Sequence, residues 1–264
     1  MKNLCISALI LVMTGLTTAP ASALSLGNNI TIFDGNAETS AGWYGTGEDQ
    51  EVEPGMVKNQ VWDLEAFFID SKNTLSLSGG FNFSTGVDGH LSGDIFIAVV
   101  NTENDLPDYG DIHRSDSDGN NNHTGSYGYD YVLDLDFTTG EYTAYQLDET
   151  SVLQTAYYQK NEGSSPWQYN AADNNDDALL NGSFSFFDSD LDETITAFEG
   201  ENHYLLTGFD LSFLGHGSEF YSHFTMGCGN DNLMGHGVVV PEPGTWLLLG
   251  AGLIGLALAR RRNS

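Results

Sequence analysis

Basic side chains are scarce in this chain. Only 8 of its 264 residues are Lys or Arg, against 37 Asp or Glu, which gives a net charge of −29 at pH 7. Half of the basic residues lie at the two ends, so residues 24–244 hold four of them against all 37 acids, a net charge of −33. Such a field repels phosphate and anionic lipid and attracts divalent cations. We therefore expect neither nucleic acid nor an anionic lipid surface as a partner.

Cysteine is nearly absent as well. The chain contains only Cys5 and Cys228, and Cys5 lies in a segment that we expect to be removed. No disulfide bond can then form within the mature chain, although an extracellular compartment would permit one. The body must be held together by its core, by bound ions or by both. Its roughly 215 residues are enough for one sizeable domain.

Long apolar runs are missing from the body and occur only at the two ends. The first 23 residues have the features of a secretory signal peptide. Lys2 precedes an apolar stretch from Leu4 to Leu16, and the small residues Ala21 and Ala23 mark a cleavage site. This pattern predicts that residues 1–23 direct export and are then removed.

The C-terminal end has three parts in a fixed order. They are Pro241-Glu242-Pro243, the uncharged stretch 245–259, and Arg260-Arg261-Arg262. The two prolines favour an extended, accessible backbone. The apolar stretch would form a helix of about 22 Å, short for a bilayer but able to span it with local thinning. The arginines that follow predict a cytoplasmic C-terminus.

This order of parts resembles the PEP-CTERM sorting signal. The stretch 223–233 (HFTMGCGNDNL) also resembles a segment that often precedes that signal. The resemblance implies an exported protein whose processing partner is an exosortase. It further implies a transient single-pass membrane anchor and, after tail removal, a place in the cell envelope or outside the cell. The function of the body stays open.

The body alternates apolar and polar residues with a period of two, which is typical of half-buried strands. In the clearest run, Tyr129, Tyr131, Leu133, Leu135 and Phe137 share one face, and Asp130, Asp134 and Asp136 share the other. Clusters of Gly, Asn, Asp and Ser separate such runs, and Gly140 suits a hairpin turn. We predict an all-β domain, an antiparallel β-sandwich or jelly roll, over residues 24–235. A linker with the Pro-Glu-Pro motif (236–244) and a transmembrane helix with an Arg-rich tail (245–264) would follow.

One acidic stretch has the ligand spacing of a calcium loop. Asp188, Asp190, Asp192 and Glu199 occupy positions 1, 3, 5 and 12, and Thr194 would offer its carbonyl at position 7. Position 6, usually Gly, is Glu193, and the preceding residues 183–187 have a strand pattern. The alternative is a solvated acidic turn. We expect calcium binding, without a helix on the incoming side.

A second cluster contains residues that can bind transition metals. His216, His223, Cys228 and His236 lie within 21 residues, but their spacing fits no paired zinc pattern. The sequence favours polar loop histidines and a small buried cysteine. If Phe220 and Phe224 face the core, His223 lies on the opposite face and is expected to be exposed.

Three classes of function remain for the body. The leading one is a non-enzymatic surface or matrix domain, with calcium as a stabilising ion. The second is a module that binds extracellular polysaccharide through loop aromatics, for which Trp43, Tyr44, Trp167 and Tyr169 are candidates, although packing is the commoner role of such rings. The third is a secreted glycoside hydrolase with a carboxylate pair, which only a structure can reveal.

Overall fold

The computed structural model describes residues 26–32, 56–57, 59–100, 122–156, 164–187 and 203–241. Strands dominate these ranges, where helical structure is limited to two short 3-10 turns, η1 (Gln60–Trp62) and η2 (Ser212–Leu214). Every strand pair among them is antiparallel. The predicted all-β, antiparallel class is confirmed. Residues 1–23 and 245–264 lie outside the described ranges.

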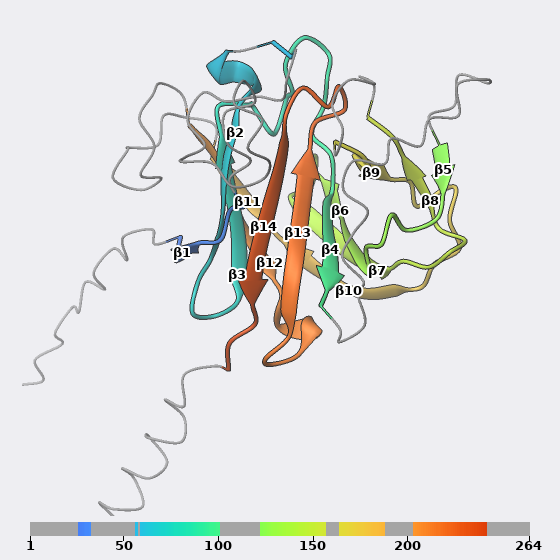
Figure 1. The fold of residues 1–264 in the computed structure, drawn as a ribbon. Coiled ribbons are helices and arrows are strands. Elements are labelled where there is room, and N and C mark those ends of the chain that lie inside the picture. The colour runs from blue at the N-terminus through green and yellow to red at the C-terminus, as the bar shows by residue number, and fades with distance from the viewer. Residues whose placement is uncertain are drawn as a thin grey trace, which may run out of the picture.

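Two sheets form the sandwich and a third, smaller sheet lies beside it (Figure 1). The first sheet contains, in spatial order, β1 (Asn28–Asn29), β2 (Leu64–Ile69), β3 (Thr74–Gly79), β12 (Tyr204–Asp210) and β11 (Ser185–Phe187). The second contains β10 (Ala178–Ser183), β7 (Glu141–Gln146), β6 (Tyr131–Asp136), β4 (Ile95–Val99), β13 (Glu219–Thr225) and β14 (Asn232–Val238). The third contains β5 (Asn122–Thr124), β8 (Val152–Gln154) and β9 (Gln168–Tyr169).

The main core lies between the two large sheets. Alternate residues of each strand point inward, as the period of two requires. Leu75 and Leu77 of β3 meet Ile95 and Ile97 of β4 within one buried cluster, which Phe224 of β13 also joins. Aromatic rings pack edge to face inside it, for example Phe83 on Phe224 with ring centroids 5.6 Å apart. Burial of these rings is the largest favourable contribution to folding here.

Both edges of the sandwich are closed by segments that pass from one sheet to the other. At one edge, residues 28–32 pair first with β2 and then with β14, where Ile32 donates its amide to Met234 and His236 donates to Ile30. At the other edge, Phe184 alone separates β10 in the second sheet from β11 in the first. These connections protect the sheet edges from pairing with other chains.

The outer face of the second sheet is also partly buried. A second apolar cluster joins Phe96 and Val132 of that face to Leu153 and Tyr169 of the small sheet. The strand β4 is therefore apolar on both faces, as a strand between two layers should be. Tyr129 belongs to this outer cluster and not to the face of Tyr131, contrary to expectation, because it precedes β6 and the alternation starts only at Tyr131.

The hairpin between β6 and β7 is formed as predicted. Asp136 pairs with Glu141, and the Gly140 amide donates to the Asp136 carbonyl. Gly140 has a φ of 72°, a conformation that glycine adopts without steric cost. The carboxylate of Asp136 also accepts the amide of Thr138, so a side-chain hydrogen bond stabilises the turn as well.

Candidate functional site

The last residues before Pro241 are held against the sandwich by hydrogen bonds. The strand β14 continues to Val238, three residues beyond the expected end of the domain at 235. Val239 is fully buried; its amide donates to Ser218 and its carbonyl accepts from Gly217. The linker expected from residue 236 is therefore part of the folded body up to this point. The reason is that β13, its partner, also runs to this end of the sheet.

Asn73 holds the next residue, Val240. The amide of Val240 donates to Oδ1 of Asn73 at 2.7 Å, and Nδ2 of Asn73 donates to the carbonyl of Val240 at 2.9 Å. One buried carboxamide thus satisfies both backbone groups of a residue 167 positions away. We call this pair of hydrogen bonds the Asn73 clamp.

The clamp is rigid because its turn is fixed on both sides. The Asn73 amide donates to the Asp70 carbonyl, and the Asp70 carboxylate accepts the amides of Lys72 and Thr74. The Asn73 carbonyl accepts the amide of Leu211, next to η2. Asn73 has a φ of 64°, which Asn tolerates better than most residues. Figure 1 shows β14, the β2–β3 turn and η2 meeting at the same end of the sandwich.

Pro241 follows the clamp directly and is exposed. Glu242, Pro243 and Arg260-Arg261-Arg262 lie outside the described residues, as do the signal-cleavage residues Ala21 and Ala23. A comparison with protein families matches residues 239–262 to the PEP-CTERM protein-sorting motif. The chain carries a PEP-CTERM sorting motif. Neither the curated proteins nor the solved structures include a match to the chain.

The PEP-CTERM motif makes this an exported protein that an exosortase processes, with a C-terminal membrane-anchor sorting signal. The match begins at Val239, so its first two residues are the ones held by the body. No helix within the described ranges is long and apolar enough to cross a membrane. The apolar stretch 245–259 lies outside these ranges.

The five predicted calcium ligands, Asp188, Asp190, Asp192, Thr194 and Glu199, all lie outside the described residues. The strands on either side of them are described. β11 ends at Phe187 and pairs with β12, where Phe187 lies opposite Leu205. The residues before the acidic stretch form strand, as their pattern predicted, and the next described strand, β12, pairs with β11.

The histidine and cysteine cluster is divided by the fold. His216 and His236 are exposed, whereas His223 and Cys228 are buried. His223 does lie on the face opposite Phe220 and Phe224. The expectation that it is exposed is wrong, because the small sheet and the residues just before β9 cover that face. Within the described ranges, no three His, Cys, Asp or Glu side chains are placed to share a metal ion.

His223 makes specific contacts in its buried position. One ring nitrogen lies 2.9 Å from the carbonyl of Pro166 and the other 3.1 Å from the sulfur of Met234. Burial lowers the pKa of His223 to about 4, and the contact with Pro166 only partly opposes this. The imidazole is therefore neutral at pH 7 and joins the two layers as a hydrogen-bonding group.

Two buried aspartates that the sequence did not single out join separate parts of the body. Asp94 accepts the amides of Leu135 in β6 and Tyr169 in β9, at 2.9 and 2.7 Å. Burial, and next the nearby Asp134, raise the pKa of Asp94 well above its usual range. Asp231 accepts the amide of Leu64 in the other large sheet. These residues come from distant segments, so no local pattern could have found them.

A buried carboxylate and imidazole form a third polar contact. Glu65 and His203 are both fully buried, with Oε1 and Nε2 3.4 Å apart. Gln60 also donates to the same Glu65 oxygen at 3.0 Å. A proton-transfer pair needs access to substrate. The burial of both side chains makes a structural role the better explanation of this contact.

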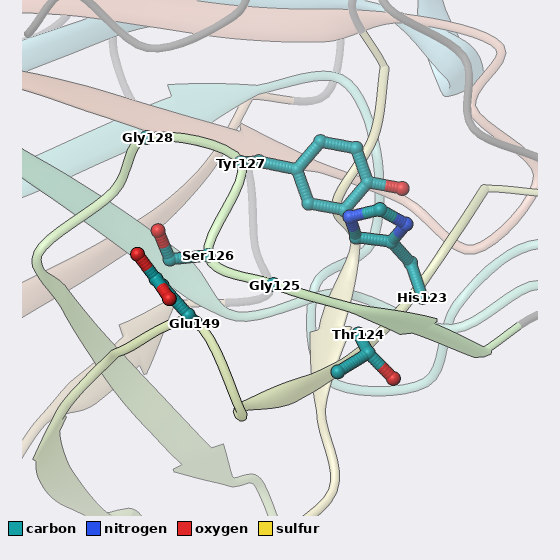
Figure 2. A pocket seen from close by; sticks show the side chains of 7 residues that line it. All are labelled: His123, Thr124, Gly125, Ser126, Tyr127, Gly128 and Glu149. Carbon is teal, nitrogen blue, oxygen red and sulfur yellow. The ribbon is translucent and has the colours of Figure 1, made fainter.

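The surface of the small sheet carries a shallow pocket of ≈ 330 Å³ (Figure 2). His123, Thr124 and the turn 125–128 line it, together with Glu149. Figure 2 shows the His123 and Tyr127 rings close together, and the Ser126 hydroxyl of the turn near the Glu149 carboxylate, which comes from the connection between β7 and β8. Tyr127 has a φ of 55°, unusual for a bulky residue, and such conformations concentrate at functional sites.

The two described loop aromatics are used in packing. Tyr169 stacks on Tyr145 with ring centroids 4.7 Å apart and donates its hydroxyl to Asp176. The half-buried Trp167 ring lies over Gly227, where an added Cβ would meet it at 3.3 Å. Trp43 and Tyr44 lie outside the described residues.

Proposed function

We propose that this exported PEP-CTERM protein serves as a non-enzymatic component of the cell surface or the extracellular matrix. One observation carries the proposal. The buried carboxylates Asp94 and Asp231 accept backbone amides and link parts of the fold. A carboxylate whose lone pairs are engaged in this way supports a rigid body rather than turnover of a substrate.

The acidic composition fits this role. With a net charge of −33 over residues 24–244, the body repels other acidic chains and stays soluble after release. The same charge attracts divalent cations, which can bridge the protein to acidic matrix polymers. A matrix component needs stability and solubility, and the closed edges of the sandwich supply the first without disulfides.

The first test follows the processed protein in cells. We expect the tail-free form in the cell envelope or matrix fraction, and replacement of Pro241, Glu242 and Pro243 by alanine should retain the full-length chain in the membrane. Purified processed protein should show no turnover on a panel of glycans. Turnover that disappears on substitution of a single Asp or Glu would contradict the non-enzymatic role and support a glycoside hydrolase.

Calcium binding by Asp188, Asp190, Asp192, Thr194 and Glu199 is the second part of the proposal. The strands that precede and follow this segment in the sequence, β11 and β12, are paired with each other, so cation binding does not cost the entropy of bringing them together. Lacking the usual Gly at position 6, the segment should bind in the weak extracellular range, about 10⁻⁴ to 10⁻³ M. Binding at a hundredfold excess over Kd would stabilise the fold by about 2.7 kcal/mol.

Thermal melting with millimolar calcium or with chelator tests the site. The wild type should melt higher with calcium, and the Asp188→Ala/Asp190→Ala variant should not. A matched control is Asp173→Ala/Asp177→Ala, which removes the same charge from another acidic loop and should keep the calcium response. An equal calcium response in all three proteins would mean charge screening alone.

A polysaccharide-binding module is the alternative, and the pocket of Figure 2 is the observation that favours it. A hydroxyl, a carboxylate and an imidazole beside a tyrosine ring are groups that hydrogen-bond sugar hydroxyls. Glu149→Gln and Ser126→Ala should each weaken binding to matrix polysaccharide in a pull-down. Binding unaffected by both would leave the pocket without this role.

A further inference from the structure

The distance between the folded body and the membrane anchor is very short. Asn73 holds Val240, and the apolar stretch begins at residue 245, so only Pro241 to Gly244 separate them. Four extended residues span at most about 14 Å. The headgroup layer on each face of a bilayer takes up roughly 5–7 Å of such a distance. The clamped body therefore stands close against the membrane, where a membrane-embedded protease must reach the motif.

We propose that the Asn73 clamp limits exosortase processing by holding Val240 against the body. Exosortase then has only the four residues after the clamp, and the folded sandwich sits directly beside them. Release of the clamp lengthens the accessible segment from four to five residues, about 3.5 Å more. This inference rests on exosortase processing of the tail, and it assigns to Asn73 the role of a positioning residue.

The structure explains why loss of the clamp frees Val240 alone. Val238 pairs with Glu219 at the end of a seven-residue ladder between β13 and β14, and residues further back are progressively harder to open. Val239 is fully buried and makes two backbone hydrogen bonds to the turn at Gly217 and Ser218, so it stays in place without Asn73. Val240 depends on a single side chain and is 39% exposed, so less apolar burial opposes its release than opposes the release of Val239.

Asn73→Gly is the best variant, because glycine accepts the φ of 64° without strain and removes only the carboxamide. Asn73→Asp keeps an acceptor for the Val240 amide and loses the donor to its carbonyl. Asp88→Gly is the matched control, since Asp88 also has a positive φ, 49°, but lies in an exposed turn that Val87 and His90 close by hydrogen bonds to each other. A fourth variant inserts Gly-Ser-Gly-Ser after Val240.

Hydrogen exchange of the full-length chain in detergent measures the clamp itself. Loss of two hydrogen bonds of ordinary strength corresponds to about a thirtyfold shift in the opening equilibrium. Asn73→Gly should therefore speed exchange at Val240 about thirtyfold, Asn73→Asp by less, and Asp88→Gly not at all. Exchange within β13 and β14 should stay slow in all of them. Unchanged exchange at Val240 in Asn73→Gly would overturn the clamp.

Pulse-chase labelling in cells that contain exosortase measures processing. Asn73→Gly and the insertion should each remove the tail at least threefold faster than wild type and Asp88→Gly. The two changes combined should be no faster than the insertion alone, because both act through the length of accessible chain. Additive acceleration would indicate general loosening of the body, and slower or unchanged removal in Asn73→Gly would contradict a limiting clamp. Tail retention in every variant would refute exosortase processing itself.

Discussion

The two faces of the six-stranded sheet are both buried, but they are built in different ways. The inner face packs Ile97, Phe220 and Phe224 against the other large sheet in a mainly apolar core. The outer face is covered by a sheet of only eight paired residues in three short strands, and there polar groups such as Asp94 and His223 join the layers. A small covering layer supplies little apolar area, so hydrogen bonds have to fix its position.

The comparison predicts that the inner face contributes most to stability. Phe224→Ala removes a fully buried ring that packs on Phe83, and it should lower the free energy of unfolding by about 3–5 kcal/mol. Denaturant unfolding of the purified protein measures this. The matched control is Phe187→Ala in β11, where the ring is 39% exposed and the loss should stay within about 1 kcal/mol. Equal losses at the two positions would remove the distinction.

On the outer face, His223→Gln should change how stability depends on pH. Burial lowers the pKa of His223 to about 4 from 6.5, so below pH 6.5 the unfolded chain binds a proton that the folded chain does not. The free energy of unfolding is therefore unaffected by the titration of His223 above pH 6.5 and falls by about 2–3 kcal/mol as the pH is lowered to 4. Glutamine keeps a donor for Pro166 and does not titrate. The stability difference between pH 7 and pH 4.5 should therefore become smaller; an unchanged difference would show that His223 is solvated.

Asp134 should act in the opposite direction over the same pH range. Burial, and next the charge of Asp136, raise its pKa to about 6 from 3.8. Its contribution is present below about pH 4 and is lost as pH rises through 6. Asp134→Asn should stabilise the protein at pH 7 by about 1 kcal/mol, allowing for solvent screening of a half-buried group.

Asp136→Asn is the matched comparison for that prediction. Its exposed carboxylate accepts the amide of Thr138, which lowers the pKa of Asp136. Its stabilising contribution is therefore present at neutral pH and lost in acid, so the Asn variant should be less stable at pH 7. Two variants that shift stability in the same direction would contradict the assigned environments.

The smallest effect on stability is expected on the part of the outer face that the small sheet does not cover. His236 lies on the outer face of β14, stacks on Tyr221 at 4.5 Å and contacts Glu219 at 2.6 Å, but remains exposed. His236→Ala should cost about 0.5 kcal/mol, as exposed polar pairs usually do. A loss above about 1.5 kcal/mol in the same unfolding experiment would mean that this part of the face is covered in solution.

Local patterns accounted for the features that depend on neighbouring residues. The alternation from Tyr131 to Phe137 places β6 correctly, and Thr-Thr-Gly predicts the hairpin at Gly140, because strand faces and turns are decided over two to five residues. The sorting tail was found for the same reason, since its three parts follow one another along the chain.

Features that depend on a third layer could not be found in this way. His223 was expected to be exposed because its strand alternates, but residues 164–169 return from a distant position to cover it. Asp94 and Asp231 look like ordinary acids in the sequence, and their roles come from amides 41 to 167 residues away.

By itself, the sequence determined that this protein is exported, carries a PEP-CTERM tail and has an antiparallel β body. A sorting signal is a linear motif, and a strand is recognised from the period of two of its apolar residues. Only the tertiary structure decided that the body extends as far as Val240. Pro241 follows a residue that Asn73 holds through a turn 167 positions earlier, and a hydrogen bond between such distant residues exists only once the chain has folded.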